Sequence, residues 1–133
     1  MSYIQFNEFN NKMAYEFAYH VLDIISEEQL NPVRIRVVFD NDIVYQYMMD
    51  GKKGDLWLNR KQKTVEETHE SSLHVWLHQD KYPHMIDNES YAVCGGGYPL
   101  IINNEFRGTF IVSGLAHQED HQLILDAIER MKK

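Results

Sequence analysis

Two alternating runs of hydrophobic residues, joined by a short polar turn, constrain the fold more than any other feature. Residues 33–39 place a hydrophobic side chain at every second position, with Arg34, Arg36 and Val38 between them, and residues 43–49 resume the alternation. A period of two is typical of β-strands, the first with one buried face. Asp40-Asn41-Asp42, between the runs, has the residue types that favour turns. The two runs therefore predict a β-hairpin.

Helical periodicity lies at both ends of the chain. Hydrophobic residues recur three or four positions apart between Phe9 and Leu30, which predicts an amphipathic helix ending before Asn31-Pro32. The same spacing returns in a last helix that starts at about Asp120, the candidate N-cap.

Two shorter helices are expected in the middle of the chain. Asp55 is a candidate N-cap for the first, along which Trp57, Lys61 and Val65 fall on one stripe. Ser71-Ser72 supplies a candidate N-cap for the second. The polar segment 79–90 is expected to be a loop.

Three consecutive glycines, Gly95-Gly96-Gly97, are the most unusual local feature. They follow the β-type run Tyr91–Cys94, and Tyr98-Pro99 with a strand at Leu100–Ile102 comes next. The glycines lack the spacing of a dinucleotide fingerprint or a Walker loop, and no helix follows them. We therefore expect a strand-to-strand corner, a β-bulge or a close approach of the backbone to another group.

The expected element order is helix, two strands, two helices, three strands and helix, with residues 103–108 forming a turn before a strand at 109–113. Hairpins dominate, which favours an α+β fold with a mostly antiparallel sheet of about five strands and helices packed on it. The 133 residues are expected to form one domain, residues 1–133.

Charge and composition exclude several classes of partner. A net charge of −7 disfavours nucleic acid, and the basic stretch Arg60–Lys63 is followed at once by Glu66-Glu67. No hydrophobic run approaches the roughly 18 residues of a membrane span, and residues 1–12 do not resemble a signal peptide. With a single cysteine, these features predict a cytoplasmic protein with neither a nucleic-acid nor a membrane partner.

Seven histidines raise the question of a metal or heme site. His74/His78 and His117/His121 each have the i,i+4 spacing that places two imidazoles on one helical face. The first pair could equally be half-exposed surface histidines. If Asp120 caps the last helix, His117 lies in the preceding loop and the second pair is broken. No H-E-x-x-H motif is present, and no metal site is predicted.

Lysine, serine and cysteine side chains offer further alternatives. Lys61 could meet an anionic ligand in a partly dry pocket, or extend its ammonium to solvent past Trp57. Ser113 lies in no G-x-S-x-G elbow, so hydrolase chemistry has no support. Cys94 has apolar neighbours before it and is interpreted as a small core residue.

Three segments together resemble a known family. They are WLNRKQKTVEETHESS (Trp57–Ser72), GGGYPL (Gly95–Leu100) and VSGLAHQEDH (Val112–His121). In this order they resemble the heme-degrading-domain family, a branch of the GlcG/HbpS-like superfamily. The resemblance implies a profilin-like fold with an antiparallel five-stranded sheet, assembled as a homo-oligomer of stacked dimers. It also implies a link to heme or iron binding.

The segments supply the candidate ligand-binding residues, although no catalytic residue is assigned. If the ligand is heme or a related anionic cofactor, Lys61 pairs with a carboxylate and Trp57 stacks on the ring. The glycines let the backbone approach, and His121 or a tyrosine is a candidate axial ligand. The full set comprises Trp57, Lys61, Ser72, Gly95, Gly96, Gly97, Ser113 and His121.

Three hypotheses for function follow. The chain binds a small ligand, with heme the possible cofactor; or it is an oligomeric scaffold without a ligand, in which these residues mark subunit contacts; or it is a heme-degrading enzyme. The sequence leaves open whether it catalyses a reaction.

Overall fold

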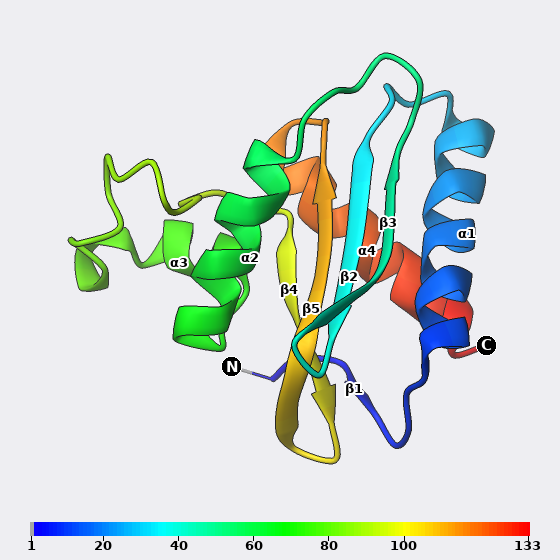
Figure 1. Ribbon diagram of the computed structural model, residues 1–133, viewed down its shortest axis with the longest axis horizontal. Helices are drawn as coiled ribbons and strands as arrows, with labels where there is room; N and C mark the ends of the chain where they lie inside the picture. Colours follow the sequence, from blue (N-terminus) through cyan, green and yellow to red (C-terminus); the bar gives the residue numbers. More distant parts are fainter. Residues whose placement is uncertain (1) are drawn as a thin grey trace.

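A five-stranded β-sheet, with helices on both faces, organises residues 2–133, which the computed structural model describes (Figure 1). The strands are β1 Gln5–Phe6, β2 Arg34–Phe39, β3 Asp42–Met48, β4 Gly97–Ile102 and β5 Glu105–Ser113, and their order across the sheet is β1-β4-β5-β2-β3. The α+β class and the five-stranded sheet are confirmed. The purely antiparallel sheet is wrong, because β1 pairs in parallel with β4. The profilin-like description stays a prediction.

The helices form a layer on each side of the sheet. They are α1 Asn11–Glu28, α2 Leu56–Thr68, α3 Ser72–Leu77, the 3₁₀ turn η1 Gln79–Lys81, and α4 His117–Met131. α1 and α4 pack together against one face, and α2 and α3 lie on the other side (Figure 1). No helix within residues 2–133 has the length and hydrophobicity that a membrane-spanning segment needs.

Both hairpins close over tight turns of left-handed residues. Asp40 and Asn41, with φ of 51° and 69°, join β2 to β3 as predicted. Asn103 and Asn104, with φ of 48° and 68°, join β4 to β5. Such turns match the twist of the strands, and Asn and Asp tolerate the conformation better than most residues. The turn predicted over residues 103–108 is therefore too long, because β5 already begins at Glu105.

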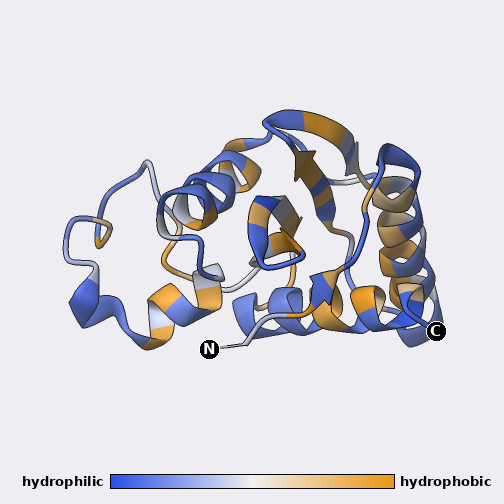
Figure 2. Ribbon diagram, turned by 90° about the horizontal axis from the view of Figure 1, so that it is seen from below, coloured by the Kyte–Doolittle hydropathy of each residue, from blue (hydrophilic) through white to orange (hydrophobic). Residues whose placement is uncertain are grey.

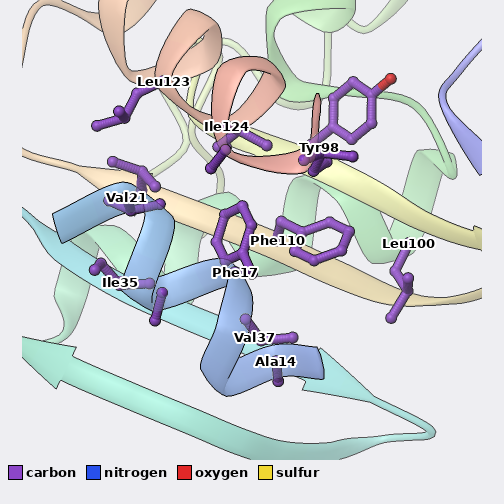
Figure 3. Packing of buried hydrophobic residues seen from close by; sticks show 14 of the residues in the cluster. Ala14, Phe17, Val21, Ile35, Val37, Tyr98, Leu100, Phe110, Leu123 and Ile124 are labelled. Atoms are coloured by element: carbon purple, nitrogen blue, oxygen red, sulfur yellow. The ribbon is translucent and has the colours of Figure 1, made fainter. Parts of the chain in front are cut away.

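The main core lies between the sheet and the α1–α4 layer (Figure 3). Phe17 of α1 and Phe110 of β5 are completely buried, with ring centroids 4.6 Å apart. Val21, Ile35 and Ile124 close the space around them. Burial of such side chains contributes about 1.5–3 kcal/mol each.

The strand β2 is buried on both faces, which corrects the prediction of one buried face. Arg36 is only 2% exposed because α2 covers it. Its guanidinium donates to Asn59 Oδ1 at 2.7 Å and Gln62 Oε1 at 2.9 Å on α2, and to Gln46 Oε1 at 2.7 Å on β3. A charged side chain can be buried here because polar side chains accept its hydrogen bonds.

The run Tyr91–Cys94, predicted as a strand, has no sheet partner and extends along α2 instead. The N–H of Ala92 donates to Thr64 Oγ1 at 2.9 Å, and Arg60 Nε donates to the Tyr91 carbonyl at 2.7 Å. Side chains of α2 thus take the hydrogen bonds that a neighbouring strand would have supplied.

Only one of the two predicted caps in the middle of the chain forms a capping hydrogen bond. Ser71 caps α3, and its Oγ accepts from the His74 N–H at 3.1 Å. Asp55 precedes α2 but makes no side-chain cap. Its carboxylate lies 3.6 Å from the guanidinium of Arg36 instead.

The segment between α3 and β4 projects away from the sheet (Figure 1) and is largely hydrophilic (Figure 2). It is a loop as predicted, apart from η1 at its start. Val75, Met85 and Tyr91 form a second small hydrophobic cluster that anchors it.

Candidate functional site

The Gly95–Gly97 corner is packed tightly against two helices. Ser72 Oγ accepts from the Gly97 N–H at 2.8 Å, and His117 Nδ1 accepts from the Gly95 N–H at 2.9 Å. A side chain at Gly95 would collide with the His117 backbone carbonyl. The glycines therefore allow the start of β4 to touch both α3 and α4.

Lys61 fills the space beside Gly96. Gly96 has φ of 122°, and a Cβ there would collide with Lys61 Nζ and the Val112 carbonyl oxygen. Lys61 is 2% exposed, and its ammonium donates to the Val112 carbonyl at 2.9 Å and to Asp120 Oδ2 at 3.1 Å. Lys61 thus does not extend to solvent past Trp57, because two protein oxygens hold its ammonium inside.

Asp120 is the buried partner of this ion pair. The helix α4 begins at His117, so the prediction that Asp120 caps it is wrong. From the first turn the carboxylate accepts from the Leu115 N–H at 2.9 Å and the Gly114 N–H at 3.3 Å. Burial raises the pKa of the Asp120 carboxyl, while the ammonium of Lys61 opposes the shift.

The Lys61 cavity, which we name after that residue, has a volume of about 270 Å³. Trp57, Lys61 and Ser113 line it together with Cys94 and Asp120. Burial raises the pKa of the Cys94 thiol, which favours its neutral form over the nucleophilic thiolate. Lys61 and Asp120 pair with each other here, whereas Arg34, which also lines the cavity, donates to the backbone carbonyls of Lys53 and Gly54.

The His121 cavity is larger, at about 480 Å³, and lies on another side of the glycine corner. Segments far apart in the sequence build it: the chain before β1, α3, the start of β4 and one side of α4. Its lining is mostly apolar and includes Tyr3, Ile4, Leu73, His74, Leu77, Tyr98, His121 and Leu125.

Two imidazoles are the notable polar groups of the His121 cavity. The Nδ1 atoms of His74 and His121 are buried and have no hydrogen-bond partner among residues 2–133. Burial lowers the pKa of both imidazoles, so both are expected to be neutral at pH 7. The charged form of either ring would leave a buried N–H without an acceptor.

The tyrosine hydroxyls at this cavity are already engaged. Tyr3 donates to Glu70 at 2.8 Å and accepts from the Ser71 N–H at 2.9 Å. Burial raises the pKa of Tyr3 to about 12 and raises that of Tyr98, whose hydroxyl accepts from the Ile4 N–H at 2.8 Å. Both side chains remain neutral phenols near pH 7.

The candidate residues divide between two places. Trp57, Lys61 and Ser113 line the Lys61 cavity, and His121 lines the other. Ser72 and the three glycines line neither of these two cavities and form the packed corner between them.

The i,i+4 histidine pairs also have structural partners. His117 is the first residue of α4, so the pairing is not broken by a loop. Its Nδ1, however, accepts from the Gly95 N–H, and its ring packs edge-on against Trp76 with the ring centroids 4.7 Å apart. The ring centroids of His74 and His78 lie 4.4 Å apart. No group of three or more His, Cys, Asp or Glu side chains in the described chain is arranged to hold a metal ion.

Sequence reasoning missed part of the His121 cavity. His74 was considered only for its pairing with His78, and Tyr98 only as a neighbour of the glycines. Tyr3 and Ile4 carried no signal, because their place depends on the pairing of β1 with β4.

Comparison with known proteins now adds the family. Residues 9–129 match the model of a family described as haem degrading protein HbpS-like. A UPF0303 protein from Psychromonas ingrahamii is 30% identical over 142 aligned positions, covering 99% of this chain and 88% of the relative. One from Brucella anthropi is 28% identical, covering 92% and 78%.

Solved structures share the fold. The Ybr137w protein superposes with a TM-score of 0.84 at 20% identity, covering 96% of this chain and 81% of the other. HbpS gives 0.78 at 16% identity, covering 98% and 94%. A complex of PduOC with heme gives 0.71 at 16% identity, covering 95% and 94%. At these identities the likeness establishes the architecture alone.

Proposed function

Since the chain belongs to the HbpS-like family, we propose that it is a binding protein whose His121 cavity holds a predominantly apolar small molecule, with a tetrapyrrole as the first candidate. One observation carries the proposal: a mostly apolar cavity of about 480 Å³ that two imidazoles line, with burial favouring their neutral form. Relatives in fold support the choice of tetrapyrrole, since one was solved as a heme complex.

The dimensions and chemistry favour the larger cavity. Small-molecule sites typically occupy about 300–1,000 Å³ and combine apolar walls with a few polar groups that fix orientation. The His121 cavity, at about 480 Å³, falls within that range. The Lys61 cavity, at about 270 Å³, is smaller, and its buried ammonium and carboxylate, Lys61 and Asp120, pair with each other.

Heme itself fits this cavity only in part. Histidines that ligate a metal almost always donate their second ring N–H to an acceptor. Neither His74 nor His121 has such an acceptor at Nδ1, and the phenols of Tyr3 and Tyr98 remain protonated. Among the described residues no lysine or arginine lines the cavity to pair with propionates, whereas Glu129 does line it. The residues fit the apolar body of a tetrapyrrole and do not fit ligation of its iron.

A titration with hemin and with metal-free protoporphyrin IX tests this proposal. We expect the two to bind with similar affinity, because the macrocycle and not the iron is recognised. Leu73→Trp narrows the cavity and should weaken both, whereas Leu56→Trp, at a side chain 60% exposed outside it, should change neither. The proposal fails if neither porphyrin binds, or if the two variants behave alike.

Self-association is a second function that we propose, on a separate observation. Tyr15 and Tyr19 of α1 are 58% and 56% exposed, and Ile43 and Tyr47 of the edge strand β3 are 52% and 43% exposed. Exposed hydrophobic side chains beside an unpaired strand edge favour pairing with another chain. Native mass spectrometry should give a multiple of the 15.8 kDa subunit. Tyr47→Lys should reduce the mass, and an unchanged mass would contradict a contact at β3.

A further inference from the structure

The surroundings of Nδ1 decide which ring nitrogen of His74 and of His121 carries the proton. In both His74 and His121 this atom is buried without a partner. A buried N–H without an acceptor forfeits a hydrogen bond that it would make in water, and orphaned N–H groups are rarer than undersatisfied acceptors. The favoured neutral tautomer therefore leaves Nδ1 as a bare lone pair and carries its proton on Nε2.

The Nε2 atoms are the ring nitrogens that remain for a ligand. In each ring, Nδ1 is the nitrogen that is both enclosed and without a partner, and Nε2 is not. Both residues line the cavity. Each Nε2–H is thus a donor beside an apolar volume. A donor of this kind recognises an oxygen acceptor, whereas a metal ion needs a free lone pair at the same atom.

The charges around the cavity favour a neutral oxygen acceptor over an anionic one. Burial lowers the pKa of both rings and so favours their neutral form, and the lining residues within 2–133 include Glu129 but no lysine or arginine. The whole chain has a net charge of −7. A carboxylate or phosphate would therefore lose its hydration without gaining a counter-charge. A carbonyl oxygen needs only a hydrogen bond.

We infer that His74 and His121 each present an Nε2–H donor to the His121 cavity, and that the cavity encloses a neutral, largely apolar part of its ligand that carries carbonyl oxygen, whereas acidic groups such as the propionates of a porphyrin stay outside it in water. This inference rests on the proposed function in one respect, namely that the cavity binds a small molecule. It goes beyond that function by assigning the recognising atoms and the chemical class of the ligand.

A matched pair of probes tests the ligand class. 2-Acetylnaphthalene and 2-isopropylnaphthalene have nearly the same shape, and only the first has a ketone oxygen. One hydrogen bond in a dry site is worth roughly a three- to tenfold gain in affinity, so the ketone should bind tighter by about that factor. His121→Leu should reduce the advantage of the ketone, the double variant His74→Leu/His121→Leu should remove it, and His121→Gln, which retains a donor, should keep more of it than His121→Leu. His84→Leu, at an exposed histidine bonded to Glu67, is the control.

The outcomes separate the inference from the proposed function. Equal binding of the two naphthalenes overturns the inference and leaves the proposed function standing. Failure of both naphthalenes and both porphyrins to bind overturns the two together. Long-range ¹H–¹⁵N correlation spectra of the ligand-free protein give an independent readout: we expect Nε2–H tautomers for His74 and His121, and an Nδ1–H tautomer in either ring contradicts the assignment.

Discussion

Replacing Gly96 by alanine tests whether Lys61 fills the glycine corner. Gly96 has φ of 122°, a conformation that costs an alanine about 1–3 kcal/mol. The new Cβ would also collide with Lys61 Nζ and the Val112 carbonyl. Displacing that ammonium disturbs its bond to Val112 and its ion pair with Asp120, and overpacking of this kind costs about 1–3 kcal/mol more. We therefore expect Gly96→Ala to lower the free energy of unfolding by about 2–6 kcal/mol.

Gly51→Ala provides a matched control. Gly51 also has a positive φ, 94°, but a Cβ there would meet no atom within 4 Å. Urea unfolding of both variants separates backbone strain from collision, and we expect Gly96→Ala to lose about 1–3 kcal/mol more than Gly51→Ala. Because both substitutions disturb one contact, Gly96→Ala should cost less in a Lys61→Met background than alone. Equal losses at the two glycines would refute the view that the corner is packed by Lys61.

Three further predictions concern neighbouring groups. Lys61→Met should cost about 3–5 kcal/mol in urea unfolding at pH 8, because Asp120 is left buried and unpaired. The loss should shrink at pH 5, since burial already raises the pKa of that carboxyl and its protonation removes the charge; equal losses at both pH values would contradict this. Burial lowers the pKa of His121 from 6.5, so the unfolded chain binds more protons as the pH falls below about 7. Stability should thus decline from pH 7 to 5, less steeply in His121→Leu, and an unchanged slope would exclude the histidine. Ser72→Ala leaves the Gly97 N–H without its acceptor and should cost about 1–3 kcal/mol, measured by thermal unfolding; a neutral result would imply another acceptor.

Features set by neighbouring residues could be predicted from the sequence. The hairpin of β2 and β3, the helix α1 and the Ser71 cap each depend on residues a few positions apart. The strand β1 could not be predicted, because it has only two residues and its partners are Ile101 and Ile102. The burial of Arg36 was equally hidden, since its acceptors lie on β3 and α2.

In the candidate site, too, the sequence indicated single residues but not their distant partners. The stripe of α2 and the family resemblance singled out Lys61, but its partner Asp120 lies 59 positions away and was assigned as a helix cap. His74 and His121 line one cavity from different helices, and each was considered only with a histidine of its own helix. Side-chain spacing within one element carried no information on which helices would meet around the glycine corner.

The sheet order also bears on the path of folding. Each hairpin closes over a tight turn. The two hairpins are joined by the pairing of β2 with β5, and α2, α3 and the loop before β4 lie between the hairpins in the sequence. Closing that long loop costs chain entropy before its contacts form, so we expect the main barrier at this seam. Gly108 lies in this β2–β5 pairing, and a side chain there would collide with the backbone of Val38. Obstructing the β2–β5 seam should slow refolding, while weakening the two-residue strand β1 should chiefly speed unfolding.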